Sequence, residues 1–191
     1  SMPRLLLFAV LAACTPAGLL RAQAAPVELV WTHADSVEAQ RGAWRGQPTL
    51  RATLPTLRVD AHVRALTDVR LELQPAGPVA VVREVELSGA GGGARPQELA
   101  VEVEVSPGER ASLTATLHAR TGDGGTATWQ ATLFIVSDDT TLYLSRVSFA
   151  TVELRRLRAA RDAGYITAEQ FEVAVRALLV QPSVPAAREP R

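Results

Sequence analysis

Residues 98–105 read ELAVEVEV, so apolar side chains alternate with side chains that are mostly charged. Successive side chains on a β-strand point to opposite faces, and this pattern predicts a strand with one buried side and one solvent-facing side. The sequence SPGE follows at 106–109, and residues 113–119, LTATLHA, alternate again. Because proline and glycine favour a tight turn, the sequence predicts two strands with a turn between them.

The same period of two extends to both sides of these two predicted strands. The further predicted strands are 28–32, 50–54, 57–63, 69–73, 79–87, 128–136 and 142–150. Short strands at close intervals, separated by turn residues, are typical of an antiparallel β-sandwich of the immunoglobulin-like or fibronectin-III-like kind. We therefore predict a mainly β body at residues 25–151. No helical pattern interrupts these strands, which argues against βαβ folds and their nucleotide sites.

The hydrophobic period changes at Val152, and residues 152–180 are predicted to form an α-helical hairpin. Gly164 stands where the first helix should end, and Thr167 with Gln170 forms a capping box for the second helix. Five apolar residues follow the helical spacing and are the predicted association residues: Leu154, Leu157, Phe171, Val175 and Leu178. Two helices this short are marginal alone, so they need a partner surface. That surface is either the β body or a second copy of the chain, and we favour self-association.

The hairpin also resembles a known family between residues 153 and 179. The matching residues read Leu154-x-x-Leu157, Asp162-x-Gly164-x-Ile166-Thr167-x-Glu169-x-Phe171-Glu172 and Leu178-Leu179. On these residues the segment is similar to SHOCT, the short C-terminal domain family. That family occurs at the ends of unrelated bacterial proteins and is suspected of mediating association, so the resemblance implies assembly and no catalysis. The lysines common in the family's second helix are absent here.

Residues 1–24 have the organisation of a secretory signal peptide. Arg4 gives a positive start, the apolar run is LLLFAVL at 5–11, and Ala22 and Ala24 form a small-x-small cleavage site. Alternatively, the sequence LAAC resembles a bacterial lipobox and would make Cys14 a lipidated residue. Both interpretations predict export: to the periplasm or the medium in the first case, and as an outer-membrane-anchored lipoprotein in the second.

Charge and composition exclude several classes of function. The chain has 20 basic and 20 acidic residues, and this balance argues against a nucleic-acid partner or an anionic membrane surface. All the basic residues are arginine. The absence of lysine excludes Schiff-base chemistry and a phosphate loop of the GxxxxGK[ST] type. Residues 181–191 contain three prolines and are predicted to be a disordered tail.

Residues 41–46, RGAWRG, contain the best candidates for recognition. Tryptophan and arginine are enriched at binding hot spots, and the flanking glycines predict a loop that presents them. We therefore predict Trp44, Arg41 and Arg45 as binding residues. The alternative is that Trp44 folds back as a lid on one end of the β body.

Two His–Asp pairs are the candidates for transition-metal chemistry. His33 with Asp35, and Asp60 with His62, are spaced by two residues and would share one face of a strand. If these strands were neighbours, the four side chains could converge on a transition metal in a small metal-dependent envelope enzyme. We expect instead exposed ion pairs, without a metal or another cofactor. The sequence also lacks a Gly-x-Ser-x-Gly elbow for a serine nucleophile.

These features favour an exported, non-enzymatic binding and assembly protein of the bacterial cell envelope. Its expected partners are a protein or an envelope component, together with a second copy of the chain.

Overall fold

The computed structural model describes residues 27–60, 66–83 and 97–180. The predicted signal peptide with Cys14, residue His62, and the predicted tail at 181–191 lie outside these ranges.

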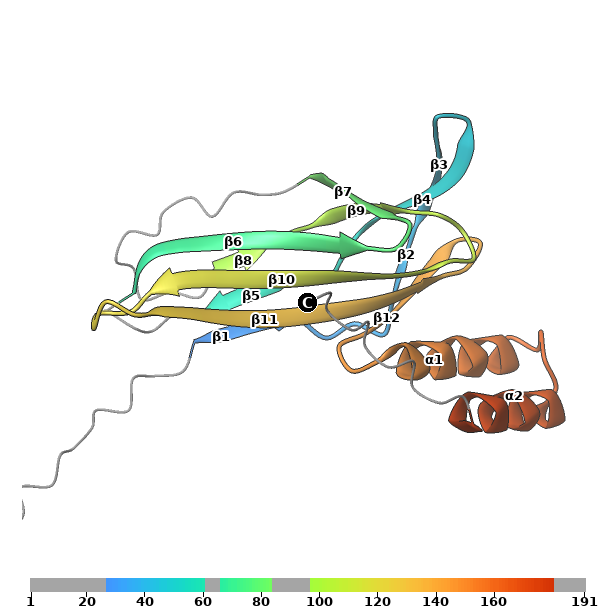
Figure 1. Ribbon diagram of the computed structural model, residues 1–191. Coiled ribbons are helices and arrows are strands. Elements are labelled where there is room, and N and C mark those ends of the chain that lie inside the picture. The colour runs from blue at the N-terminus through green and yellow to red at the C-terminus, as the bar shows by residue number, and fades with distance from the viewer. Residues whose placement is uncertain (1–26, 61–65, 84–96, 181–191) are drawn as a thin grey trace, which may run out of the picture.

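The described chain is mainly β, with two helices at its C-terminal end (Figure 1). The strands are β1 (Glu28–Trp31), β2 (Ser36–Glu38), β3 (Gln40–Trp44), β4 (Gln47–Thr53), β5 (Leu57–Asp60), β6 (Thr67–Ala76), β7 (Val79–Arg83), β8 (Gln97–Leu99), β9 (Glu102–Val105), β10 (Arg110–Arg120), β11 (Thr126–Ser137) and β12 (Thr141–Ser145). The helices are α1 (Phe149–Asp162) and α2 (Ala168–Val180).

The described strands form three antiparallel sheets. Their strand orders are β1-β5-β8, β2-β12-β11-β10-β6 and β3-β4-β9-β7. The segment 98–105, predicted as one strand, is divided between β8 and β9. At this division the amide of Leu54 donates a hydrogen bond to the carbonyl of Val101. The neighbouring segment is also interrupted here, between β4 and β5, because Pro55 has no amide hydrogen to donate to a strand partner.

Apolar residues from all three sheets form a single buried cluster. The alternation predicted from the sequence is confirmed: Leu99, Val101, Val103 and Val105 are buried, and so are the apolar residues of 113–119. Trp31, at 1% exposure, joins two sheets, because its indole Nε1 donates a 3.1 Å hydrogen bond to the carbonyl of Ala131 on β11. Strand β10 pairs with β11 over its whole length, from Arg110 opposite Val136 to Arg120 opposite Thr126.

Two predictions about local structure were wrong. Residues 41–46 are not a loop, since 40–44 form strand β3 and only Arg45 and Gly46 make the turn to β4. The helical segment begins at Phe149 rather than at Val152, so residues 149–150 do not belong to a strand. The reason is an N-cap: the side chain of Ser148 accepts a hydrogen bond from the amide of Thr151.

Helix α1 docks on one end of the β body, against β11 and β12. Val152 is fully buried, and the ring of Phe149 packs edge-on to Phe134 at 4.9 Å. Glu153 forms an ion pair with Arg110 of β10 at 2.8 Å. Arg155 donates to the carbonyl of Leu144 on β12. The body is therefore one partner surface of the hairpin.

Helix α2 packs on α1 and buries no residue fully. Its predicted capping box is confirmed: the amide of Gln170 bonds to the hydroxyl of Thr167, and the amide of Thr167 bonds to Oε1 of Gln170. Gly164 has a φ of 78°, which explains a glycine at the end of α1. Neither described helix has the length and apolar character needed to cross a bilayer.

Candidate recognition groove

The β3–β4 hairpin extends beyond the rest of its sheet (Figure 1). Its register places Trp44 opposite Gln47, with a two-residue turn between them. Arg45 and Gly46 have φ values of 50° and 80°, the left-handed conformations that a type I′ turn requires. Pro48 stands opposite Ala43, at a position where this register needs no hydrogen bond to β3. The local sequence therefore suits a tight hairpin that carries Trp44 next to its tip.

A groove of about 770 Å³ lies beside this hairpin, bordered by β3, β4, β7 and β9. It occupies the sheet face opposite the hydrophobic core, because Leu50, Val103 and Val105 of the same strands are buried. On the groove side β7 contributes Ala80 and Val82, which are exposed. One border is thus apolar, while the other carries the indole of Trp44.

The floor of the groove is a hydrogen-bonded polar pair. The hydroxyl of Thr49 donates to Oε1 of Glu104 at 2.6 Å, and Thr49 is only 8% exposed. Gly42 makes room for this pair, since a Cβ there would lie 3.2 Å from Thr49 Oγ1 and 3.7 Å from Glu104 Oε1. The carboxylate of Glu104 therefore reaches across the sheet to a point above β3.

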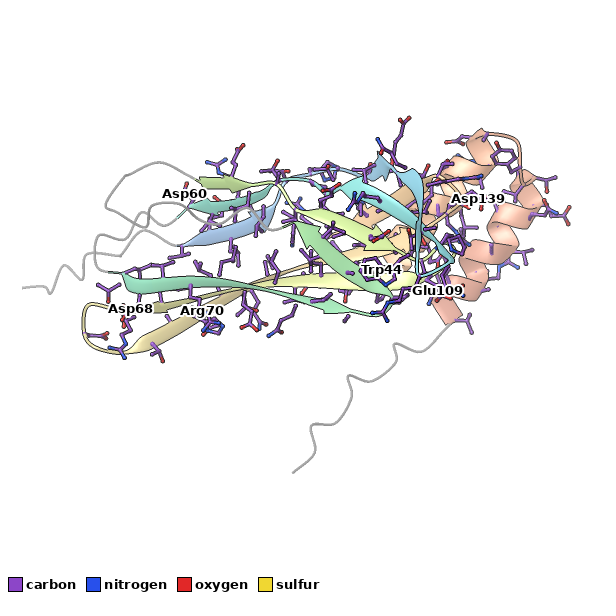
Figure 2. All side chains as sticks on the ribbon, turned by 90° about the horizontal axis from the view of Figure 1, so that it is seen from above. Trp44, Asp60, Asp68, Arg70, Glu109 and Asp139 are labelled. Carbon is purple, nitrogen blue, oxygen red and sulfur yellow. The ribbon has the colours of Figure 1, made fainter. Side chains whose placement is uncertain are left out.

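Trp44 is the main exposed aromatic surface of this region. Its side chain is labelled in Figure 2 and is 60% exposed. The guanidinium of Arg45 lies 5.8 Å from its ring centroid. Trp44 and Arg45 are thus in contact at the tip of the hairpin. Arg41 is separated from them, because its Nε donates to the carbonyl of Asp139 at 3.4 Å, on the side of the β11–β12 turn. In the structure Trp44 does not form a buried lid.

Three residues of the metal alternative, His33, Asp35 and Asp60, form no metal-binding cluster among the described residues, and His62 lies outside these residues. Strands β1 and β5 are neighbours, but Asp60 stands opposite Glu28, five residues before His33 along the chain. Five residues of strand correspond to about 16 Å. Asp35 instead forms an ion pair with Arg155, in which a terminal guanidinium nitrogen lies 2.9 Å from Oδ1 of Asp35. The same oxygen lies 3.3 Å from Nε2 of His33. The carboxylate of Asp35 therefore helps to hold α1 on the body.

The five predicted association residues of the hairpin are all half-buried. Leu154 and Leu157 share a helical face with Arg161, whose guanidinium lies 4.7 Å from the ring of Phe171 on α2. This face of α1 is turned to α2, and Val152 and Phe149 face the body. On α2, Val173, Leu179 and Val180 are exposed at 61%, 81% and 75%.

Thr49, Glu104 and Val82 were not predicted as site residues. Their positions on the solvent-facing side of strands could be derived from the alternation, as for Glu104 in 98–105. Their assembly into one groove depends on the pairing of β4 with β9 and of β9 with β7, for which the sequence has no local signal.

Comparison with protein-family models, with curated proteins and with solved structures found no match to this chain.

Proposed function

We propose that this protein is an exported, non-enzymatic binding and assembly protein of the bacterial cell envelope. The groove between β3 and β7 recognises a protein or an envelope component. The observation that carries the proposal is Trp44, a large aromatic side chain held 60% exposed by a tight hairpin at the border of a groove. A buried core alone gives no reason to keep an indole in solvent, whereas binding hot spots are rich in tryptophan.

We also propose that the β body is a β-sandwich of the immunoglobulin-like or fibronectin-III-like class. Two observations support this. The buried residues of all three sheets form one cluster, and Trp31 bonds from β1 to β11 across that cluster. In such a fold, recognition surfaces lie on outer sheet faces and on end loops. The groove lies on an outer sheet face.

The C-terminal hairpin is proposed to mediate association. Its resemblance to SHOCT supports this role, as do the exposed apolar residues Val173, Leu179 and Val180 on α2. Export rests on residues 1–24 alone.

Site-specific photo-crosslinking in the native bacterium tests the binding function. A photoreactive amino acid is placed at Gln47, which is exposed and opposite Trp44, and at Val147, which is 76% exposed on another part of the surface. We expect a discrete crosslinked partner from position 47 only, and its loss when Trp44→Ala is added. The function is refuted if position 47 gives no adduct, or if both positions give the same adducts.

A further inference from the structure

The free edge of β3 offers unpaired backbone groups next to the groove. In an antiparallel pair, residues alternate between positions that exchange hydrogen bonds with the partner and positions that point away from it. The two-residue turn makes Trp44–Gln47 a bonded pair, so Gly42–Thr49 and Gln40–Arg51 are bonded as well. The amides and carbonyls of Arg41 and Ala43 therefore point away from β4. β3 ends its sheet, and no backbone hydrogen bond to Arg41 or Ala43 is found among the described residues.

The other edge of the same sheet is less suitable for pairing. Its register with β9 shifts between Val81 and Arg83 of β7, and such an irregularity interrupts a regular ladder. β3 keeps an uninterrupted register with β4 over all five of its residues. It also contains neither proline nor lysine, which natural proteins use to block exposed edges.

Beside this edge stands a carboxylate without a cationic partner among the described residues. Glu104 accepts the hydroxyl of Thr49 but makes no ion pair there. The nearby arginines are directed elsewhere: Arg51 pairs with Glu102 at 3.4 Å, and Arg41 bonds to the carbonyl of Asp139. Because Gly42 has no side chain, the space above β3 between Glu104 and the border at Trp44 is open to a side chain from outside.

We propose that the groove binds an extended peptide strand that carries one arginine or lysine. The peptide backbone pairs with the amides and carbonyls of Arg41 and Ala43 and extends the sheet by one strand. Neighbouring strands lie about 4.8 Å apart, so a peptide residue opposite Gly42 starts one strand spacing from it. Its cationic side chain then crosses above Gly42 to the carboxylate of Glu104 and the ring of Trp44. This inference rests on the proposed binding function and specifies its ligand.

Selection from a displayed library of random linear peptides tests the proposal, with the purified full chain as target. We expect the enriched peptides to combine β-branched residues with a single arginine or lysine. For the best peptide, Glu104→Gln should weaken binding about tenfold or more, because it removes a charge-assisted hydrogen bond. Glu98→Gln, which neutralises an exposed carboxylate on β8, should leave the affinity unchanged.

The backbone part of the proposal has its own variant. Ala43→Pro removes an outward-facing amide and none of the bonds to β4, and it should reduce affinity about tenfold at an unchanged melting temperature. N-methylation of alternate peptide residues should cause a similar loss without altering the protein. The proposed ligand is wrong if the selected peptides require Trp44 but carry no basic residue, or if they still bind after both Ala43→Pro and peptide N-methylation. Either result would leave groove binding intact. Selection that yields no Trp44-dependent peptide would overturn both.

Discussion

Glu153 holds helix α1 on the β body, and its replacement by glutamine measures this attachment. The residue is 8% exposed. Its Oε1 lies 2.8 Å from one terminal nitrogen of Arg110 and accepts a 3.0 Å hydrogen bond from the Nε of the same guanidinium. Its Oε2 lies 3.3 Å from Nε of Arg156, one turn further along α1. Glu153→Gln keeps the size of the side chain and removes the negative charge with which Arg110 and Arg156 form ion pairs.

The expected loss follows from these contacts. A hydrogen bond to a charged group contributes about 1.5–3 kcal/mol to stability. Arg110 is 52% exposed, so solvent screens part of that amount, and the pair with Arg156 within the helix adds only a few tenths. We therefore expect Glu153→Gln to lower the free energy of unfolding by about 1–2 kcal/mol, or the melting temperature by about 2–8 °C.

Urea and thermal unfolding, followed by circular dichroism, measure the effect. Glu172→Gln on the exposed side of α2 is the control, and it should change the free energy by less than about 0.5 kcal/mol. A double-mutant cycle with Arg110→Met should give a coupling energy of about 1 kcal/mol between the two side chains. If Glu153→Gln is as stable as the Glu172→Gln control, the ion pair does not hold α1 on the body and this reasoning fails.

Three further predictions concern stability. Val152→Ala should cost about 2 kcal/mol in urea unfolding, because that side chain is fully buried, whereas Val173→Ala at 61% exposure should cost less than about 0.5 kcal/mol. A hydrogen bond from the hydroxyl of Thr121, together with one from the amide of Gly125, lowers the pKa of Asp123. The charged carboxylate therefore stabilises the folded state at pH values above its ordinary titration range, and this stabilisation is lost as pH falls through the lowered pKa. In urea unfolding, Asp123→Asn should thus be less stable than the wild type at pH 7, and the difference in unfolding free energy should shrink as pH falls below the ordinary titration range of a carboxylate. Thr167→Ala should speed amide hydrogen exchange in the first turn of α2 and cost about 1 kcal/mol, which an unchanged exchange rate would contradict.

The elements that the sequence predicted correctly are those with a local cause. In 98–105 each buried valine is two residues from the next, so the buried face follows from the spacing alone. The capping box joins Thr167 to Gln170 over three residues, and Gly164 ends α1 by its own backbone conformation. None of these depends on a distant strand.

What could not be predicted depends on pairing between distant segments. Thr49 and Glu104, separated by 55 residues, meet only because β4 and β9 pair in one register. β3 carries Gly42 at its centre, and all five of its residues are exposed, so no apolar alternation marked it as a strand. The start of α1 was misplaced by three residues, because Val147 and Phe149 keep a spacing of two after β12 and the cap at Ser148 is a weaker signal. This shift hid Val152 as the residue that docks the helix on the body.

The two helices of the hairpin should therefore separate in a truncation experiment. α1 buries Val152 and Glu153 against the body, while α2 buries nothing fully and exposes Val173, Leu179 and Val180. Three chains that begin at Ala25 and end at Val147, at Ala163 or at Arg191 are compared. The chain ending at Val147 lacks the burial of Val152, which alone contributes about 1.5–3 kcal/mol to the free energy of unfolding, so it should be the least stable. The chain ending at Ala163 should stay folded.

Sedimentation velocity at tens of micromolar then assigns the role of α2. If it mediates self-association, the longest chain sediments as an oligomer and the chain ending at Ala163 as a monomer. Leu179→Glu in the longest chain should also give a monomer at an unchanged melting temperature, because the side chain is 81% exposed. A monomeric longest chain would refute self-association. The hairpin would then act through α1 alone, as a structural cover of β11 and β12.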